Sequence, residues 1–251
     1  SFSRGKLLDW SKPTIMGILN VTPDSFYDGG VNNTFERALS KVDEMVKAGV
    51  DIIDIGGYSS RAQAIDVSEE EEINRVIPVI KAIREKYPEC ILSIDTFRAA
   101  VADKALENGV HIVNDISGGM QDENMFDVVA KHKAVYCMMH MKGTPQTMVS
   151  QAEYSNLFLE IIDFFNKQIA KARAKGVIDI LIDPGFGFAK TEIQNYQLLK
   201  YLDVSKVLEL PILIGISRKS MVYKPLQIKS TEALNGSTVI HTIALQKGAT
   251  I

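Results

Sequence analysis

The sequence ILSIDTFRAAVADKALENG, residues 91–109, contains one complete unit of the pattern that decides the fold. Its first four residues are a short apolar run apart from one serine, and Asp95 and Thr96 follow directly. A helical stretch over 98–108 comes next, and Gly109 stands where a helix commonly ends in a left-handed residue. We therefore interpret this segment as a strand, a polar strand end and a helix.

The same order of elements recurs along the chain. The apolar runs are too continuous for a sheet with one exposed face, so they predict strands buried on both faces by helices. The predicted strands are 14–19, 52–55, 91–94, 111–113, 134–139, 180–182 and 212–216. The predicted helices are 34–48, 68–86, 98–108, 122–131, 153–175 and 231–247. Ser68 with Glu71 forms a capping-box pattern, and Asp122 is the expected cap of the helix that follows it.

This pattern predicts a TIM (β/α)8 barrel. Seven strand–helix units are visible, and an eighth strand begins as the sequence stops, so we expect it to be cut short at the C-terminus. A doubly wound open sheet is the competing architecture, but it usually has fewer units and often a GxGxxG turn, which this sequence lacks. The length of 251 residues suits one barrel, so we expect residues 1–251 to form a single domain.

Composition and charge exclude several partners. A formal net charge of −3 argues against nucleic acid or an anionic membrane surface as a ligand. No apolar run approaches the ~20 residues that a membrane span needs, and we see no signal segment. Cys90 and Cys137 are far apart and lie in or beside apolar runs, and no zinc-ligand spacing is present. We expect a cytoplasmic protein without disulfides.

Polar residues stand at the ends of most predicted strands. In a barrel the carboxyl ends of all strands meet at one rim, where active sites lie. The residues at this rim are Asn20, Asp95, Asn114, Asp183 and Lys219. Carboxylates, an amide and an ammonium suit a flat heterocycle that carries adjacent N–H donors and a carbonyl. Met138, Phe186 and Phe188 could supply apolar walls.

The first two rim loops suggest further ligands. The loop after the first strand runs from Asn20 to Gly30 without a lysine and offers an oxygen ligand for a metal. The loop after the second strand offers hydroxyls, including that of Ser60, and the guanidinium of Arg61 for an anion. No Ser–His–Asp arrangement stands out, and we expect His111, His132 and His241 to be structural.

Several of these strand ends form motifs that together resemble dihydropteroate synthase, in the right order and across nearly the whole chain. They are NVTPDSF at 20–26, DGG at 28–30, DIGG at 54–57, SIDT at 93–96, ND at 114–115, DPGFGF at 183–188 and SRKS at 217–220. The resemblance implies a barrel enzyme of folate synthesis that is a target of sulfonamides. It would join a dihydropterin pyrophosphate to para-aminobenzoate, release pyrophosphate with Mg²⁺, and form a homodimer.

The resemblance also implies a role for each site residue. Asp95 and Lys219 would be catalytic, and Asn20 would bind Mg²⁺. The pterin would contact Asp95, Asn114, Met138, Asp183, Phe188 and Lys219. Pyrophosphate would contact Asn20 and Ser60, where the family usually has threonine. Para-aminobenzoate would be bordered by Arg61, Phe188, Ser217 and Lys219.

Two departures from the family pattern keep alternatives open. Ala62 and Gln63 replace the proline and glycine of GESTRPG, which predicts altered affinity for aminobenzoate or sulfonamide with pterin binding intact. The family also continues into an Arg-x-His motif, so we expect residues beyond Ile251. The alternatives are a pterin-binding methyltransferase acting with a cobalamin partner and a non-catalytic pterin-binding protein. The SRKS lysine and the NVTPDSF loop favour the synthase.

Overall fold

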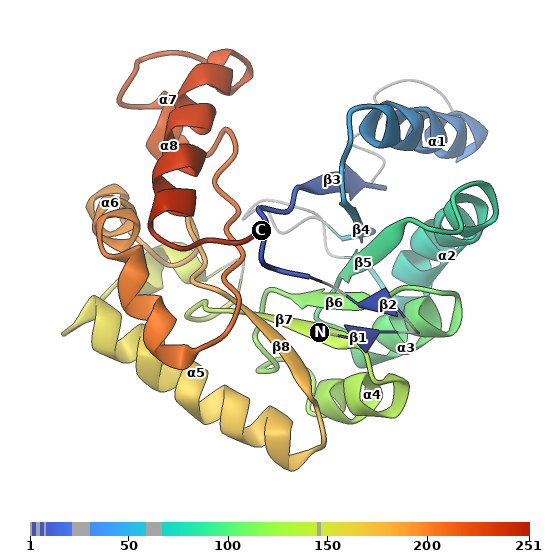
Figure 1. The fold of residues 1–251 in the computed structure, drawn as a ribbon, viewed down its shortest axis with the longest axis horizontal. Coiled ribbons are helices and arrows are strands. Elements are labelled where there is room, and N and C mark those ends of the chain that lie inside the picture. The colour runs from blue at the N-terminus through green and yellow to red at the C-terminus, as the bar shows by residue number, and fades with distance from the viewer. Residues whose placement is uncertain (1, 4–5, 8, 22–30, 59–66, 145–146) are drawn as a thin grey trace.

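A six-stranded parallel sheet curves through the centre of the protein, with helices around its outside (Figure 1). The computed structural model describes residues 2–3, 6–7, 9–21, 31–58, 67–144 and 147–251. The strands are β3 (Met16–Asn20), β4 (Ile52–Gly56), β5 (Ile91–Asp95), β6 (Ile112–Asp115), β7 (Val135–Met139) and β8 (Asp179–Asp183). They pair in chain order, as the strands of an α/β barrel do. A short antiparallel pair, β1 (Phe2–Ser3) and β2 (Lys6–Leu7), precedes them.

The helices follow the strands, as the sequence pattern predicts. They are α1 (Val31–Lys47), α2 (Glu69–Lys86), α3 (Ala99–Glu107), α4 (Met125–His132), α5 (Leu157–Ala174), α6 (Glu192–Lys200), α7 (Ser220–Tyr223) and α8 (Leu234–Gln246), with 3-10 turns η2 (Met148–Gln151), η3 (Leu202–Leu208) and η4 (Ser230–Glu232). Helix α6 was not predicted. Thr191 and Gln194 form a capping box at its start, which is the sequence signal that could have found it.

Two N-terminal helix caps were predicted, and at one of them another residue takes the capping position. The Ser68 side chain accepts a hydrogen bond from Glu71 N at 3.2 Å, so the predicted start of α2 is confirmed. Asp122 was expected to cap the helix that follows it, but Asn124 takes that position in α4. One oxygen of the Asp122 carboxylate accepts a hydrogen bond from Asn124 N at 3.0 Å, just before α4, and the other accepts one from Ala99 N at 2.7 Å, at the first residue of α3. A carboxylate is favourable there, because the first N–H groups of a helix have no partner within it.

The barrel closes at the amino ends of its strands through Thr250. The segment 211–216 lies beside β8 through a parallel bridge between Ile182 and Ile212. Thr250 N donates to Ile212 O at 2.8 Å, and Thr250 O accepts from Thr14 N at 2.8 Å. Thr250 therefore connects the segment 211–216 to the residues that lead into β3. The backbone of Thr250 and Ile251 thus lies where the sequence predicted an eighth strand to begin, although these residues are not assigned to a strand.

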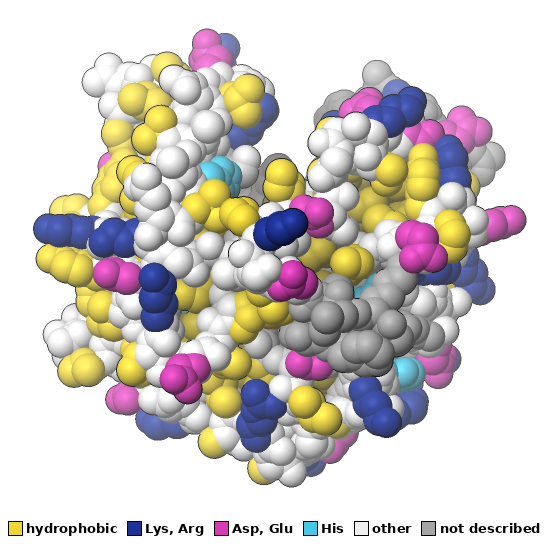
Figure 2. Space-filling view, viewed as in Figure 1, with side chains coloured by type: hydrophobic (Ala, Val, Ile, Leu, Met, Phe, Trp, Pro, Cys, Tyr) yellow, Lys and Arg dark blue, Asp and Glu magenta, His cyan; other side chains and the backbone are white. Residues whose placement is uncertain are grey.

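Apolar side chains fill the barrel interior at this same end. One buried cluster inside the barrel consists of Ile52, Ile112, Val135, Cys137, Leu181, Leu213 and Ile251. A larger cluster lies between the sheet and the helices. The polar groups of the interior lie nearer the carboxyl ends of the strands. Figure 2 shows the molecule hollowed between α8 and α1. Among the described residues, no helix combines the length and apolar character needed to cross a bilayer.

Candidate functional site

A row of strand-end residues crosses the sheet from β3 to β6. In the parallel register Asn20 lies opposite Gly56, Gly56 opposite Asp95, and Asp95 opposite Asn114. The next residue in the row is Cys137, which belongs to the barrel interior. Residues paired in register project to the same face of a sheet. The structure thus brings Asn20, Asp95 and Asn114 together on the inner face, as the sequence predicted.

Gly56 leaves space between two of these side chains. A Cβ at Gly56 would lie 3.4 Å from Asn20 Oδ1 and 3.5 Å from Asp95 Oδ2. The amide oxygen and the carboxylate therefore border the same small volume at the rim. Mg²⁺ prefers oxygen ligands and commonly uses one or two from the protein, keeping waters and substrate phosphates as the others. Among the described residues, no three His, Cys, Asp or Glu side chains are arranged so that they could hold a metal ion. The donor set fits a metal held mainly by substrate.

Asp54 is a site residue to which the sequence analysis gave no role. It lies in β4 inside the barrel, it is buried, and its Oδ2 accepts a hydrogen bond from Asn114 Nδ2 at 2.9 Å. Burial raises the pKa of Asp54, and the hydrogen bond from Asn114 acts against that rise. The signal that could have found it is an aspartate inside the apolar run IIDI. Asp54 therefore holds the side chain of Asn114 from a position deeper in the barrel than the strand ends.

Asp95 presents a carboxylate that accepts no hydrogen bond from the part of the chain that the structure describes. Its side chain is only half-buried. Burial raises the pKa of Asp95 well above its usual range, and the carboxylates of Asp54, Glu72 and Asp115 raise it further. A ligand that brings N–H donors would relieve this crowding of negative charge.

Asp183, Phe188 and Lys219 meet on the opposite side of the rim. Asp183 is buried and accepts a hydrogen bond from Gly185 N at 2.8 Å; burial raises its pKa, although this bond and the Lys219 charge oppose the rise. Lys219 Nζ donates to Phe186 O and lies 4.5 Å from the centre of the Phe188 ring. Burial lowers the pKa of Lys219 to about 8, against the attraction of Asp183. These three residues come together as predicted.

Ser217 lies in the loop before α7, two residues from Lys219, and is exposed. Arg218 between them has a φ of 53°, in the left-handed region, and its N–H donates to Ser237 Oγ at 2.9 Å. The structure places Ser217 near the rim. No hydrogen bond joins Ser217 to another predicted site residue in the described part of the chain.

The expected apolar wall at Met138 needs correction. Met139 lies opposite Asp183 in the register, so Met139 shares the inner face, and Met138 projects to the other one. Met138 is buried in the cluster between sheet and helices. Met139 instead packs in a cluster that also contacts Phe97 and Phe188. The residue that can border a ligand is Met139, one position from the residue expected.

The residues predicted in the first two rim loops are only partly described. Ser60 and Arg61, together with the departures Ala62 and Gln63, lie outside the described residues. The same is true of residues 22–30, which follow Asn20 and Val21. The residues on either side of the loop after β4, among them Gly57 and Val67, are described.

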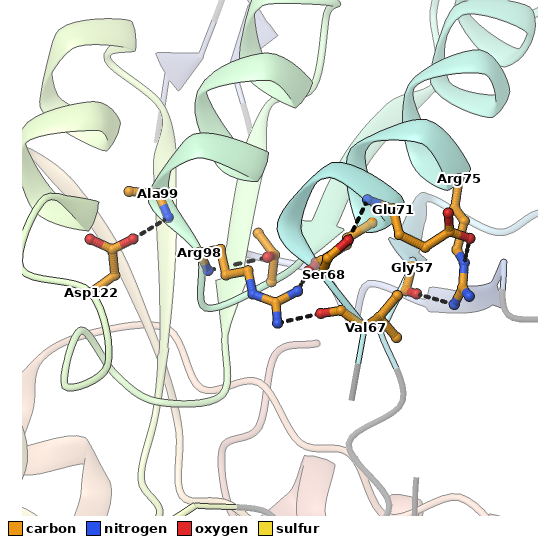
Figure 3. A network of polar contacts seen from close by, with 10 residues as sticks. Gly57, Val67, Ser68, Glu71, Arg75, Arg98, Ala99 and Asp122 are labelled. Carbon is orange, nitrogen blue, oxygen red and sulfur yellow. Dashed lines mark hydrogen bonds and ion pairs between the residues drawn. The ribbon is translucent and has the colours of Figure 1, made fainter. Parts of the chain in front are cut away.

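Two arginines hold the residues that flank this loop (Figure 3). Arg75 Nη1 donates to Gly57 O at 3.1 Å, on the β4 side. Arg98 Nη2 donates to Val67 O at 2.6 Å on the α2 side, while its Nη1 pairs with the buried Glu72 at 2.6 Å. Both ends of the loop are therefore fixed to α2 and to the segment before α3.

The fold and the rim define an α/β barrel enzyme whose site can hold a polar heterocycle. The chain matches the family model described as "Pterin binding enzyme" over residues 16–251. It is 42% identical to dihydropteroate synthase of Escherichia coli K12, over all of this chain and 89% of that protein. The chain belongs to the dihydropteroate synthase family of pterin-binding enzymes.

Solved structures agree with this assignment. The Yersinia pestis dihydropteroate synthase with a sulfonamide drug complex superposes with a TM-score of 0.93 at 42% identity, covering 100% of this chain and 91% of that chain. The Xanthomonas albilineans enzyme with 4-aminobenzoic acid has a TM-score of 0.91 at 36% identity and covers 98% of this chain and 88% of that one. The predicted barrel and family are confirmed, and the family is one of transferases.

Proposed function

We propose that the chain condenses 6-hydroxymethyl-7,8-dihydropterin pyrophosphate with para-aminobenzoate, giving 7,8-dihydropteroate and pyrophosphate. The observation that carries this proposal is the meeting of Asp95, Asn114, Asp183 and Lys219 at one rim. The chain that carries these residues is 42% identical over its full length to a dihydropteroate synthase.

The pterin would bind between the two sides of this rim. Asn114 gives one N–H to Asp54, so its amide oxygen can accept from a pterin N–H. The carboxylates of Asp95 and Asp183 accept from further N–H groups, and the Lys219 ammonium donates to the carbonyl or to a ring nitrogen. Phe188 and Met139 would pack against the ring, since both belong to one apolar cluster.

The reaction breaks the C–O bond to pyrophosphate and forms a C–N bond to the arylamine. Positive charge develops on the pterin methylene, and the nearby Asp95 carboxylate stabilises it. The arylamine is itself the nucleophile and loses one proton, so no strong base is needed. Mg²⁺ bound by the Asn20 oxygen would neutralise charge on the pyrophosphate. We assign Ser60 to the pyrophosphate, and Arg61, Phe188, Ser217 and Lys219 to the border of the aminobenzoate.

We further propose that the chain forms a homodimer in the cytoplasm. Helix α8 supports the dimer, because Leu234 and Val239 on it are 64% and 53% exposed, and exposed apolar surface commonly marks an interface. Cys137 is buried and is not part of a disulfide, as is usual in a reducing compartment.

The test is to mix the chain with the dihydropterin pyrophosphate, para-aminobenzoate and Mg²⁺ and to measure dihydropteroate and pyrophosphate. Pyrophosphate release that depends on aminobenzoate supports the synthase. Binding of pterin without product supports a non-catalytic protein, and methyl transfer to a cobalamin partner supports the methyltransferase. Asn20→Ala should raise the Mg²⁺ concentration needed for activity. An unchanged requirement for Mg²⁺ would remove Asn20 as the ligand.

A further inference from the structure

Lys190 is buried at the end of the loop that follows β8, although lysine side chains almost always reach solvent. Its Nζ lies 3.0 Å from Gly185 O, 3.1 Å from Phe188 O and 3.1 Å from His140 Nδ1. A fourth acceptor, His140 O, is 3.5 Å away. An ammonium has three protons to donate, and three close acceptors surround it. The buried charge is therefore fully hydrogen-bonded.

These acceptors belong to two different parts of the rim. His140 directly follows β7, whereas Gly185 and Phe188 belong to the loop that follows β8. The two backbones approach closely here. Gly185 has a φ of +74°, and a Cβ on it would lie only 2.1 Å from His140 O. The Lys190 ammonium therefore bridges the backbone after β7 and the backbone after β8, where Gly185 lets the two approach closely.

The peptide groups held by Lys190 also arrange the pterin side of the site. Gly185 N donates to Asp183 Oδ1 at 2.8 Å, so one residue is held by Lys190 through its oxygen and holds Asp183 through its nitrogen. Phe188, whose carbonyl accepts from Lys190, carries the ring that lies 4.5 Å from Lys219 Nζ. A change at Lys190 would therefore be transmitted through Gly185 to Asp183, at the end of β8, and through Phe188 to Lys219, at the start of α7.

We propose that Lys190 is a positioning residue whose ammonium ties the end of β7 to the loop after β8 and so holds Asp183 and Lys219 in the arrangement that binds the pterin. Lys190 does not touch the ligand in this proposal. The inference rests on the proposed function for the identity of the ligand, but its test measures pterin binding and does not require turnover.

The surrounding charges indicate when this tie is intact. Burial lowers the pKa of His140 well below its usual range, so the imidazole is neutral and its Nδ1 can accept a hydrogen bond from the Lys190 ammonium. Burial also lowers the pKa of Lys190 to about 7; the charge of Asp183 on β8 opposes this, and Lys219 and Lys142 add to it. Below this pH the ammonium ties the loop, and above it the neutral amine has only two protons to donate. Pterin affinity should fall as the pH rises through about 7.

The experiment measures the dissociation constant of 6-hydroxymethylpterin by calorimetry for the full chain and its variants. We expect Lys190→Met to weaken binding by at least about tenfold, because three hydrogen bonds from a charged group are lost. Lys190→Arg should keep the affinity within about threefold of wild type, since guanidinium retains the charge and the donors. Lys131→Met is the matched control: Lys131 pairs with Asp103 at 2.9 Å on the outer helices, and its loss should leave binding unchanged.

A purely structural role would lower the melting temperature of Lys190→Met and leave pterin binding by the folded protein unchanged, which would overturn the proposal. Lys190→Gln replaces Lys190→Met if the latter fails to fold, with the same expectation. The wild type provides a second test without substitution. An affinity that stays constant from pH 6 to pH 7.5 would also count against the tie. Absence of product with intact pterin binding would refute the proposed function and leave this inference standing.

Discussion

The side-chain nitrogen of Asn114 donates a hydrogen bond to the buried carboxylate of Asp54 over 2.9 Å. An ionised carboxylate can only accept, so this bond fixes which end of the Asn114 amide points down into the barrel. The amide oxygen is then directed to the rim. Asp54 and Asn114 come from β4 and β6, with β5 and its Asp95 between them. The orientation of one ligand-binding group thus depends on a residue two strands away.

Removing Asp54 should therefore weaken pterin binding. We expect Asp54→Ala to reduce the affinity for 6-hydroxymethylpterin by roughly 1–3 kcal/mol, because the Asn114 amide loses the acceptor that orients it. Calorimetry checks this, with Asp127→Ala as a control, since Asp127 forms an exposed pair with Lys175 on the outside of the barrel. Equal affinities for Asp54→Ala and wild type would show that Asn114 needs no support.

Asp183 offers a test of the other side of the rim. Asp183→Asn should weaken pterin binding by roughly 1–3 kcal/mol, because a buried acceptor becomes a mixed donor and acceptor. The Gly185 N–H can still donate to the amide oxygen, so the loop should keep its conformation. The measurement is pterin affinity alongside the melting temperature. Unchanged pterin affinity would remove Asp183 from the pterin site.

The two methionines at the end of β7 make a matched pair. Met139→Ala should weaken pterin binding, since Met139 lies on the inner face near Phe188. Met138→Ala should lower the free energy of unfolding by about 2–5 kcal/mol, because it leaves a cavity between sheet and helices. Pterin affinity of the folded Met138 variant should stay close to wild type. The reverse result would place Met138 in the site and restore the expectation from sequence.

Deprotonation of Lys219 should weaken pterin binding at alkaline pH. Its pKa is lowered to about 8, so in the folded protein the ammonium is present below this pH and lost above it. Pterin affinity should decline as the pH rises through about 8, and Lys219→Met should be weak at every pH without this step. The effect of Lys219 on the stability of the fold should change with pH in the opposite direction. Between about pH 8 and 10.5 the unfolded chain binds more protons than the folded one, so the free energy of unfolding should rise with pH.

Much of the fold follows from local sequence. The apolar runs are uniform enough to predict parallel strands, and Ser68 is confirmed as the cap of α2. Asp122 contacts Asn124 before α4 but also bonds the first residue of α3, because an aspartate can cap any helix terminus within reach. Its partner, Ala99 N, lies 23 positions away in the chain. Helix α6 escaped prediction because the capping box of Thr191 and Gln194 at its start was not recognised.

The site was predictable where its residues end strands. Asn20, Asp95, Asn114, Asp183 and Lys219 meet because parallel strands bring their carboxyl ends to one rim. Met138 was mistaken for Met139 because the run VYCMM is buried on both faces and shows no alternation. The roles of Asp54 and Lys190 depend on contacts between residues far apart in the chain, 60 positions for Asp54 and Asn114 and 50 for Lys190 and His140. No local pattern contains such contacts.

Because Cys137 points into the barrel, the reactivity of its thiol reports on whether the barrel is closed. Cys137 lies in the row that begins at Asn20, and burial together with four neighbouring aspartates raises the pKa of its thiol well above the usual range. Thiol reagents attack the thiolate, so the folded chain offers them almost none at this position. The rate at which Cys137 is alkylated therefore measures how often β6, β7 and β8 separate. A pterin that stabilises the closed barrel should slow that alkylation, and binding could be followed by mass spectrometry alone.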